Sequence, residues 1–354
     1  MYSRYLKIEG NSRERGIKIG ENIKDRIDVY YVNLIKYSKT ELNIDFNEFA
    51  NRCIDFMPYI EKYAPNTKEE IYGIVEGSKH SINKVLALNV AYDLTMENCP
   101  IMHSDKCTAF SVFSNTTLDN MVICGQTNDE SFQNWPSELD MVFHHKDISG
   151  LETIIYTHPG VVAYMGMNNA GISILWTYID NGERKIGLPT NIIIREMLTM
   201  RSLEEIEDYL KSIPHSVPNN FIVTHKSGKS ISFECFPNKV YTYTNSNYIT
   251  HTNHNLFSDE EEDKSASWSS KDRISVIEEL VKENYGSINI DIAKDFLRSH
   301  RRFPASICSH PNINRPLYKT LCSMIFDLTN LEAHIAFGNA CEWPYNLYKF
   351  DSTI

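Results

Sequence analysis

The sequence has no excess of basic residues. Among its 354 residues, 35 are Lys or Arg and 46 are Asp or Glu, which gives a formal net charge of −11. A protein that binds the phosphate backbone needs a basic face, so this balance argues against a nucleic-acid partner. The hydrophobic fraction of 42% is that of an ordinary globular protein.

Long apolar runs are missing as well. No stretch approaches the ~20 apolar residues that a membrane helix needs. The amino-terminal MYSRYLKIEGNSRERG is charged and has no apolar signal core. Eight cysteines are also too sparse in a chain of this length for a disulfide-framed secreted scaffold. We therefore expect a cytoplasmic protein with no membrane partner.

The sequence shows no recognisable metal or cofactor motif. No two cysteines are spaced C-x-x-C, so a structural zinc site is not expected. His251 and His254 follow a strand pattern, in which residues three apart point to opposite faces. The acidic stretch 258–268 favours a solvated loop over a calcium site, because the spaced ligands and the glycine of a calcium loop are absent. We predict no metal and no organic cofactor.

Common catalytic and nucleotide-binding motifs are absent too, namely GxSxG, the Walker lysine loop, GxGxxG and HExxH. The first hundred residues instead show mainly helical patterns. The apolar spacing predicts helices over 13–37, 46–63, 67–79 and 81–96. Thr67 is predicted as the N-cap of the third helix, with Glu70 completing a capping box. Gly16 and Gly20 are either tolerated glycines or the mark of a close helix crossing.

Alternating patterns begin near residue 107. They predict a hairpin over 107–127 and a series of further strands, with a turn at 168–171 between two of them. Helices are expected at 190–200, 202–212, 271–283 and 289–298, the second of these opened by a Ser202/Glu205 capping box. The further strands are expected at 140–145, 152–158, 161–167, 172–179, 220–226, 230–236, 239–245, 247–253, 320–328 and 332–339. Runs of strands alternating with runs of helices indicate α+β layers.

Cys107 lies where the helical part ends and the β part begins, in HSDKCTAFSVF. On the residues alone, two interpretations stay open. Cys107 is an ordinary buried cysteine, which behaves as a small hydrophobe. Alternatively, cleavage before Cys107 gives it a free α-amine with a pKa of about 7.7–8.0, which can act as general base for its own thiol.

Nine segments in order resemble the autoproteolytic acyltransferase and hydrolase family of isopenicillin N acyltransferase, the C45 group of N-terminal-nucleophile (Ntn) amidohydrolases. They are NSRERGIKIGENIKDRI, EEIYGIVEGSKHSINKVLALNVAYDL, DKCTAF, GQTNDE, HPGVVAYMGMNNAGIS, HTNH, SSKDR, SMIFDL and GNACEWPY. The resemblance runs almost end to end. It implies a four-layer αββα fold of two antiparallel sheets between helices. It also implies one domain, with residues 1–106 a leader that is cleaved but retained and 107–354 the catalytic chain.

The resemblance assigns roles to particular residues. Cleavage would occur between Lys106 and Cys107, and Cys107 would then attack the substrate amide. Asn253, in HTNH, would donate its side-chain amide to the oxyanion, and Asp129, in GQTND, would help to order the site. Without that family, Asn253 is a strand-end turn residue and Asp129 a turn cap. His251 and His254 are expected to support the loop.

Two positions depart from the family pattern. Lys106 stands where members often carry Gly, which tolerates the strained backbone of an acyl shift. Ser309, in SICSHP, stands where the family has Arg, and the sequence leaves open whether Arg301, Arg302 or Arg315 replaces it.

The resemblance implies an amidohydrolase or acyltransferase that acts on a small linear amide through a thioester on Cys107. Hydrolysis is favoured over transfer, because transfer requires that water be excluded. The alternative is a catalytically inactive small-molecule-binding or scaffold protein of the same fold. Tyr164, Met165, Met167 and Trp176 are candidates for an apolar acyl pocket, although aromatic residues at strand spacing more often belong to the core.

Overall fold

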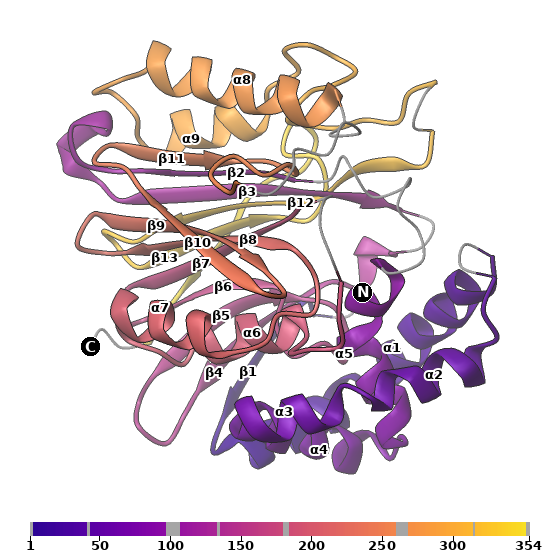
Figure 1. The fold of residues 1–354 in the computed structure, drawn as a ribbon. Coiled ribbons are helices and arrows are strands. Elements are labelled where there is room, and N and C mark those ends of the chain that lie inside the picture. Colours follow the sequence, from indigo (N-terminus) through magenta and orange to yellow (C-terminus); the bar gives the residue numbers. More distant parts are fainter. Residues whose placement is uncertain are drawn as a thin grey trace.

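The computed structural model describes residues 3–40, 43–96, 107–132, 135–179, 184–259, 268–313 and 316–351. Its strands form two sheets stacked face to face between helices (Figure 1). The fold is therefore the predicted αββα sandwich. No helix among the described residues combines the length and the apolar character that crossing a membrane requires.

The larger sheet contains eight strands among the described residues, in the order β1-β4-β5-β6-β7-β8-β9-β10. Their bounds are Tyr5–Glu9 (β1), Met141–Lys146 (β4), Glu152–Thr157 (β5), Met165–Asn168 (β6), Ile172–Tyr178 (β7), Asn219–His225 (β8), Lys229–Phe236 (β9) and Lys239–Thr244 (β10). All neighbours are antiparallel except β1 and β4, which are parallel. The helical prediction for the first hundred residues missed β1.

The smaller sheet contains six strands among the described residues, in the order β11-β2-β3-β12-β13-β14. Their bounds are Tyr248–His251 (β11), Cys107–Val112 (β2), Ile123–Ser131 (β3), Tyr318–Asp327 (β12), Glu332–Ala336 (β13) and Asn346–Lys349 (β14). The predicted hairpin of β2 and β3 is confirmed, while β14 was not predicted. Cys107 is thus the first residue of a strand held between β11 and β3.

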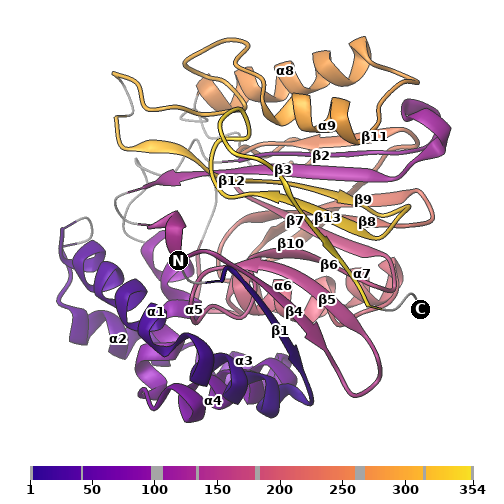
Figure 2. The same cartoon turned by 180° about the vertical axis from the view of Figure 1, so that it is seen from behind.

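Helices cover both outer faces. Figures 1 and 2 show α8 (Trp268–Glu283) and α9 (Ile290–Leu297) on the six-stranded sheet, and α6 (Thr190–Met197) and α7 (Leu203–Ser212) on the eight-stranded one. The amino-terminal helices extend this second layer. They are α1 (Ser12–Thr40), α2 (Phe46–Ile54), α3 (Met57–Tyr63), α4 (Pro65–Ser78) and α5 (Ile82–Met96).

Of the two predicted capping boxes, one is confirmed and the other is wrong. Ser202 and Glu205 form the predicted capping box at the start of α7. The prediction for Thr67 is wrong, because α4 begins at Pro65 and Thr67 lies inside it. The buried hydroxyl of Thr67 donates instead to the Glu196 carboxylate on α6, at 2.5 Å. The predicted helix 46–63 is also divided, into α2 and α3.

The close helix crossing suggested by Gly16 and Gly20 is confirmed. A Cβ at Gly16 would overlap the Glu70 carbonyl of α4, and one at Gly20 would overlap the Ile74 carbonyl. On α4, Gly73 and Gly77 face α1 in the same way. The four glycines therefore let the two backbones touch.

The amino-terminal helices share one apolar core with the sheets. A single cluster of buried residues includes Ile27 of α1, Leu88 of α5, Met165 of β6 and Phe326 of β12. The predicted leader is thus part of the same hydrophobic body as the predicted catalytic chain.

Candidate active site

Cys107 opens β2 with its thiol facing the space between the sheets. Its register partner on β3 is Asn128, and side chains opposite each other in a pair of strands share a face. Gln126, two residues earlier on that face, exchanges hydrogen bonds with the backbone of Trp176 in the other sheet. Cys107 is 5% exposed. The thiol is therefore held in a polar seam between the two sheets.

Asn253 lies two residues beyond β11 and joins Cys107 to both sheets. Its Oδ1 accepts a hydrogen bond from the backbone N–H of Cys107 at 2.9 Å. Its Nδ2 donates to the carbonyl of Tyr178, at the end of β7, at 3.1 Å. This side chain therefore contacts the very nitrogen that cleavage before Cys107 would turn into an α-amine.

Arg273 completes the arrangement from the first turns of α8. Its Nη2 donates to Asn253 Oδ1 at 2.9 Å, and its Nη1 donates to the Cys107 carbonyl and to Thr108 Oγ1. Arg273 is 1% exposed. The sequence analysis did not single it out, although SSKDR, which ends in Arg273, was among the segments that carried the family resemblance.

Asn128 is a second residue that the sequence analysis missed. Its Oδ1 is 3.9 Å from Cys107 Sγ and accepts a hydrogen bond from Tyr164 Oη at 3.3 Å. Within the described part of the chain, its buried Nδ2 has no hydrogen-bond partner. An unpaired buried donor beside a nucleophile can stabilise a developing oxyanion.

The structure does not bring Asp129 into contact with the thiol. Successive residues of a strand point to opposite faces, so Asp129 faces away from Cys107 and Asn128. Its carboxylate accepts a hydrogen bond from Thr320 Oγ1 of β12 at 2.6 Å. Lys106, the other half of the predicted cleavage site, lies outside the described residues.

His251 and His254 support the loop that carries Asn253. His251 contacts Glu234 on β9 through Nε2 at 3.2 Å. His254 contacts Ser270 on α8 through Nδ1 at 2.7 Å. The two imidazoles thus fasten the loop to different neighbours, as predicted.

Of the three arginines proposed for the site, the two that the structure describes, Arg301 and Arg302, do not lie there. Arg301 pairs with Glu283 at 2.7 Å, and Arg302 pairs with Asp272 and Glu279 at the surface. Arg315 lies outside the described residues. The guanidinium that contacts Cys107 belongs to Arg273.

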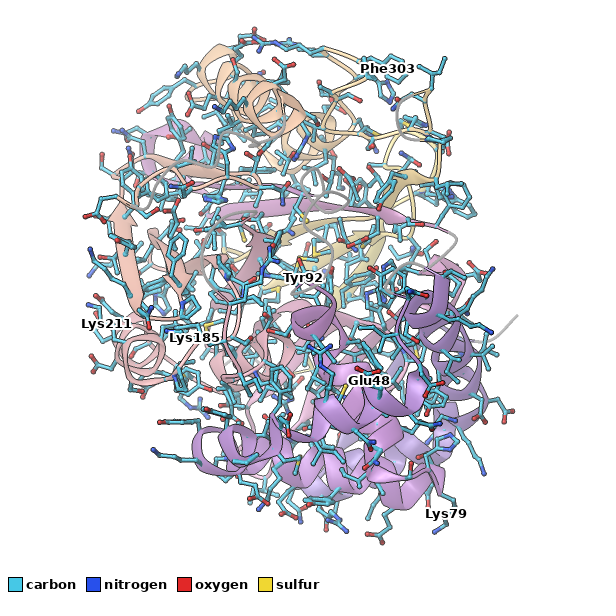
Figure 3. All side chains as sticks on the ribbon, turned by 45° about the vertical axis from the view of Figure 1, so that its right-hand side comes forward. Glu48, Lys79, Tyr92, Lys185, Lys211 and Phe303 are labelled. Carbon is cyan, nitrogen blue, oxygen red and sulfur yellow. The ribbon has the colours of Figure 1, made fainter. Side chains whose placement is uncertain are left out.

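An aromatic pocket lies next to Cys107, between the amino-terminal helices and the sheets. It is lined by Tyr30, Leu88, Ala91, Tyr92, Glu130, Trp135, His158, Val161, Tyr164 and Asn191. Tyr92, on α5, lies where the helices meet the sheets (Figure 3). Of the predicted pocket residues, Tyr164 lines it and Trp176 packs edge-on against Tyr164. Met165 and Met167 are buried in the apolar core.

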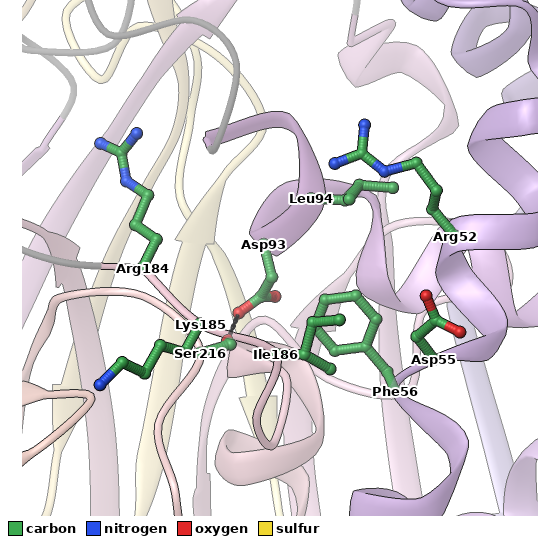
Figure 4. A pocket seen from close by; sticks show the side chains of 9 residues that line it. All are labelled: Arg52, Asp55, Phe56, Asp93, Leu94, Arg184, Lys185, Ile186 and Ser216. Carbon is green, nitrogen blue, oxygen red and sulfur yellow. Dashed lines mark hydrogen bonds between the residues drawn. The ribbon is translucent and has the colours of Figure 1, made fainter.

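A second pocket, beside the carboxyl-terminal part of α5, is charged (Figure 4). Arg52, Arg184 and Lys185 line it together with Asp55 and Asp93. Burial raises the pKa of Asp93 to about 6, although its carboxylate accepts hydrogen bonds from Thr190 and Ser216. The chemistry of an apolar acyl group fits the aromatic pocket better than this one.

A sequence model of one family matches residues 116–342, and its description is acyl-coenzyme A:6-aminopenicillanic acid acyl-transferase. The matched segment contains Asp129, Asn253 and Arg273 and begins after Cys107. Among curated protein sequences, none matches the chain.

Several solved structures are similar in fold. Penicillin V acylase from Agrobacterium tumefaciens is 14% identical, with a TM-score of 0.43, over 65% of this chain and 83% of its own. The Caenorhabditis elegans N-acylethanolamine-hydrolyzing acid amidase ortholog is 14% identical, with a TM-score of 0.46, over 63% and 93%. A mutant conjugated bile acid hydrolase from Clostridium perfringens is 13% identical, with a TM-score of 0.42, over 70% and 98%.

Proposed function

Because the chain belongs to the acyl-coenzyme A:6-aminopenicillanic acid acyl-transferase family, we propose that it is a self-processing amidohydrolase or acyltransferase with Cys107 as its nucleophile. The substrate is a small linear amide with an apolar acyl group. The observation that carries the proposal is the hydrogen bond from the Cys107 nitrogen to Asn253 Oδ1, an acceptor that Arg273 also contacts. Any buried backbone N–H needs an acceptor, but here the acceptor is a side-chain oxygen held by a buried arginine rather than a carbonyl of the neighbouring strand.

Processing begins when Cys107 Sγ attacks the carbonyl carbon of Lys106. The C–N bond then breaks, the nitrogen of Cys107 takes the thiol proton, and the acyl group moves to sulfur as a thioester. Water hydrolyses the thioester, which leaves residues 1–106 with a carboxylate and Cys107 with a free amine and a free thiol. The reaction needs no histidine as base.

The same groups perform the turnover. The α-amine accepts the thiol proton, and the thiolate attacks the substrate carbonyl. Asn253 and Asn128 supply amide donors on either side of Cys107, and the leaving amine carries away the proton as the thioester forms. The positive charge of Arg273 beside the α-amine favours its neutral form, which is the form that accepts a proton.

The aromatic pocket suits the acyl group. Tyr164 links this pocket to the nucleophile, because its ring lines the pocket while its hydroxyl donates to Asn128. An apolar chain in the pocket would lie against Leu88, Val161 and aromatic rings. Hydrolysis is the expected reaction, since an acyltransferase must in addition keep water from the thioester.

Arg273 also bears on the alternative of an inactive scaffold. That alternative draws support from two departures from the family pattern, Lys106 in place of Gly and Ser309 in place of Arg. Arg273 supplies a buried guanidinium at the nucleophile by another route, which supports an active enzyme.

Processing is tested by intact-mass analysis and amino-terminal sequencing. We expect two fragments from the 40.9 kDa chain, the larger one beginning CTAFSVF. Cys107→Ala should leave one chain, while Cys124→Ala, at a buried cysteine of the next strand, should still be cut. A panel of N-acyl amines, with and without hydroxylamine, then separates hydrolysis from transfer. Full activity of an uncut wild type would contradict the mechanism.

A further inference from the structure

Four potential metal ligands converge at the surface near the carboxyl end of the chain. They are His300, Cys308, His310 and Cys341, and their ligand atoms all lie within 4.8 Å of one another. His300 follows α9, Cys308 and His310 lie in the loop before β12, and Cys341 follows β13. We propose that these four residues bind a zinc ion.

The spacing of the ligand atoms fits one tetrahedral ion. Zinc bonds of ~2.3 Å to sulfur and ~2.05 Å to nitrogen place tetrahedral ligands about 3.8 Å (S to S), about 3.6 Å (S to N) and about 3.3 Å (N to N) apart. The two sulfurs here are 3.5 Å apart, and the two Nε2 atoms are 3.1 Å apart. His310 Nε2 is 3.7 Å from Cys308 Sγ and 3.3 Å from Cys341 Sγ.

The surroundings of the ligands match those of a zinc site. Asn339 Nδ2 is 3.4 Å from Cys308 Sγ, where it can donate to a thiolate. Glu342 Oε1 is 3.7 Å from His310 Nδ1, so a carboxylate faces the ring nitrogen that points away from the cluster. Such outer partners fix the tautomer of a ligating histidine and offset thiolate charge.

The donor set favours zinc over other occupants of the cluster. Two thiolates neutralise a divalent cation, and sulfur and imidazole ligands exclude calcium and magnesium, which prefer oxygen. The two sulfurs are well beyond the ~2.05 Å of a disulfide. No zinc site was predicted from the sequence, because it has no C-x-x-C pair. Such a pair is not required here, because the fold brings the four ligands together from three loops.

The site would connect the carboxyl-terminal loops to the active-site sheet. Ser309 lies between the ligands Cys308 and His310, and its N–H donates to Thr320 Oγ1 at 2.9 Å. That hydroxyl in turn donates to Asp129. The ion would therefore have a structural role, holding the loop that packs against β12 and β3.

The test is the metal content of untagged, full-length protein purified under reducing conditions, measured by plasma mass spectrometry. We expect about one zinc per chain. Replacement by cobalt should give the strong visible absorption of a tetrahedral thiolate site. Alkylation of Cys341, which is exposed, should be blocked until a chelator removes the ion.

Two single variants at exposed ligands separate binding from folding. Cys341→Ser and His300→Ala should each lose most of the bound zinc. The control His225→Ala, at a partly exposed histidine at the end of β8, should keep it. Since His300 and Cys341 are both exposed, failure of one variant to fold leaves the other as the test. Metal-free wild type, a Cys308–Cys341 disulfide in its place, or zinc retained in both ligand variants would overturn the proposal.

Discussion

At the scale of single residues, the side chain of Asn253 connects Cys107 to the rest of the candidate site. It accepts from the Cys107 nitrogen and donates to the end of β7. Removing one preorganised oxyanion donor typically costs ~10²–10³ in rate. We therefore expect Asn253→Ala to lower kcat by about that factor and to change KM much less, as measured by steady-state hydrolysis of the preferred N-acyl amine.

Asn255→Ala is the matched control for this prediction. Asn255 lies in the same loop, and its amide donates to Ser258. This variant should keep kcat within a few-fold of wild type. Equal losses in both variants would assign Asn253 to loop structure alone.

Individual site residues were predictable only where a motif named them. Cys107 and Asn253, from DKCTAF and HTNH, do lie in contact through the Cys107 nitrogen. Arg273 and Asn128 were missed although SSKDR and GQTNDE contain them, because those segments do not indicate which side chain faces Cys107 until the partner strands are known. The same holds for the four proposed zinc ligands, whose spacing along the chain follows no metal-binding pattern.

At the scale of elements, the crossing of α1 and α4 depends on backbone contact at glycines. Replacing a helix-interior glycine by alanine ordinarily stabilises by about 1 kcal/mol through helix propensity. At Gly16 the added Cβ overlaps the Glu70 carbonyl, and overpacking costs about 1–3 kcal/mol. Gly16→Ala should therefore lower the free energy of unfolding, the opposite of what propensity alone predicts.

Urea unfolding measures this difference. It is best done in a Cys107→Ala background, which keeps one chain so that unfolding stays unimolecular. Glu21→Ala, on the exposed face of the same helix, serves as the control and should be close to neutral. A more stable Gly16→Ala protein would show that the two helices can separate at little cost.

Long periodic elements were predictable, whereas short edge strands were not. The β2–β3 hairpin and the α7 capping box follow from local patterns. Strand β1 pairs in parallel with residues more than 130 positions away, so nothing local marks it. Thr67 and Glu70 had the spacing of a capping box, but tertiary partners on α6 took both side chains.

At the scale of the whole molecule, buried charges fasten the predicted leader to the predicted catalytic chain. Glu70 of α4 accepts from Arg15 of α1 and from Arg195 of α6. Burial alone would raise the pKa of Glu70, but Arg195, His145 and Arg15 together hold it well below its ordinary value. The layered fold was predictable from the resemblance, whereas these long-range pairs were not.

Asp93 fastens the same boundary in a pH-dependent way. From α5 it accepts from the backbone N–H and the hydroxyl of Thr190, at the start of α6, at 3.1 and 2.9 Å. Burial raises its pKa from 3.8 to about 6. The folded chain therefore keeps the Asp93 proton at pH values where the unfolded chain has lost it.

The stability of the molecule should consequently fall, through this carboxyl, as pH rises from about 4 to about 6. The contribution is fully present below pH 3.8 and is lost above the folded-state pKa, and a shift of this size is worth at most about 3 kcal/mol.

The Asp93→Asn variant tests this prediction, because its amide does not titrate. Its free energy of unfolding should not show this fall between about pH 4 and about pH 6, whereas that of the parent should, as measured by urea titrations in the Cys107→Ala background. Asp208→Asn, at an exposed carboxylate of α7, should run parallel to the parent. Parallel curves for Asp93→Asn as well would mean that the buried carboxyl is ionised throughout, with the hydrogen bonds from Thr190 and Ser216 outweighing its burial.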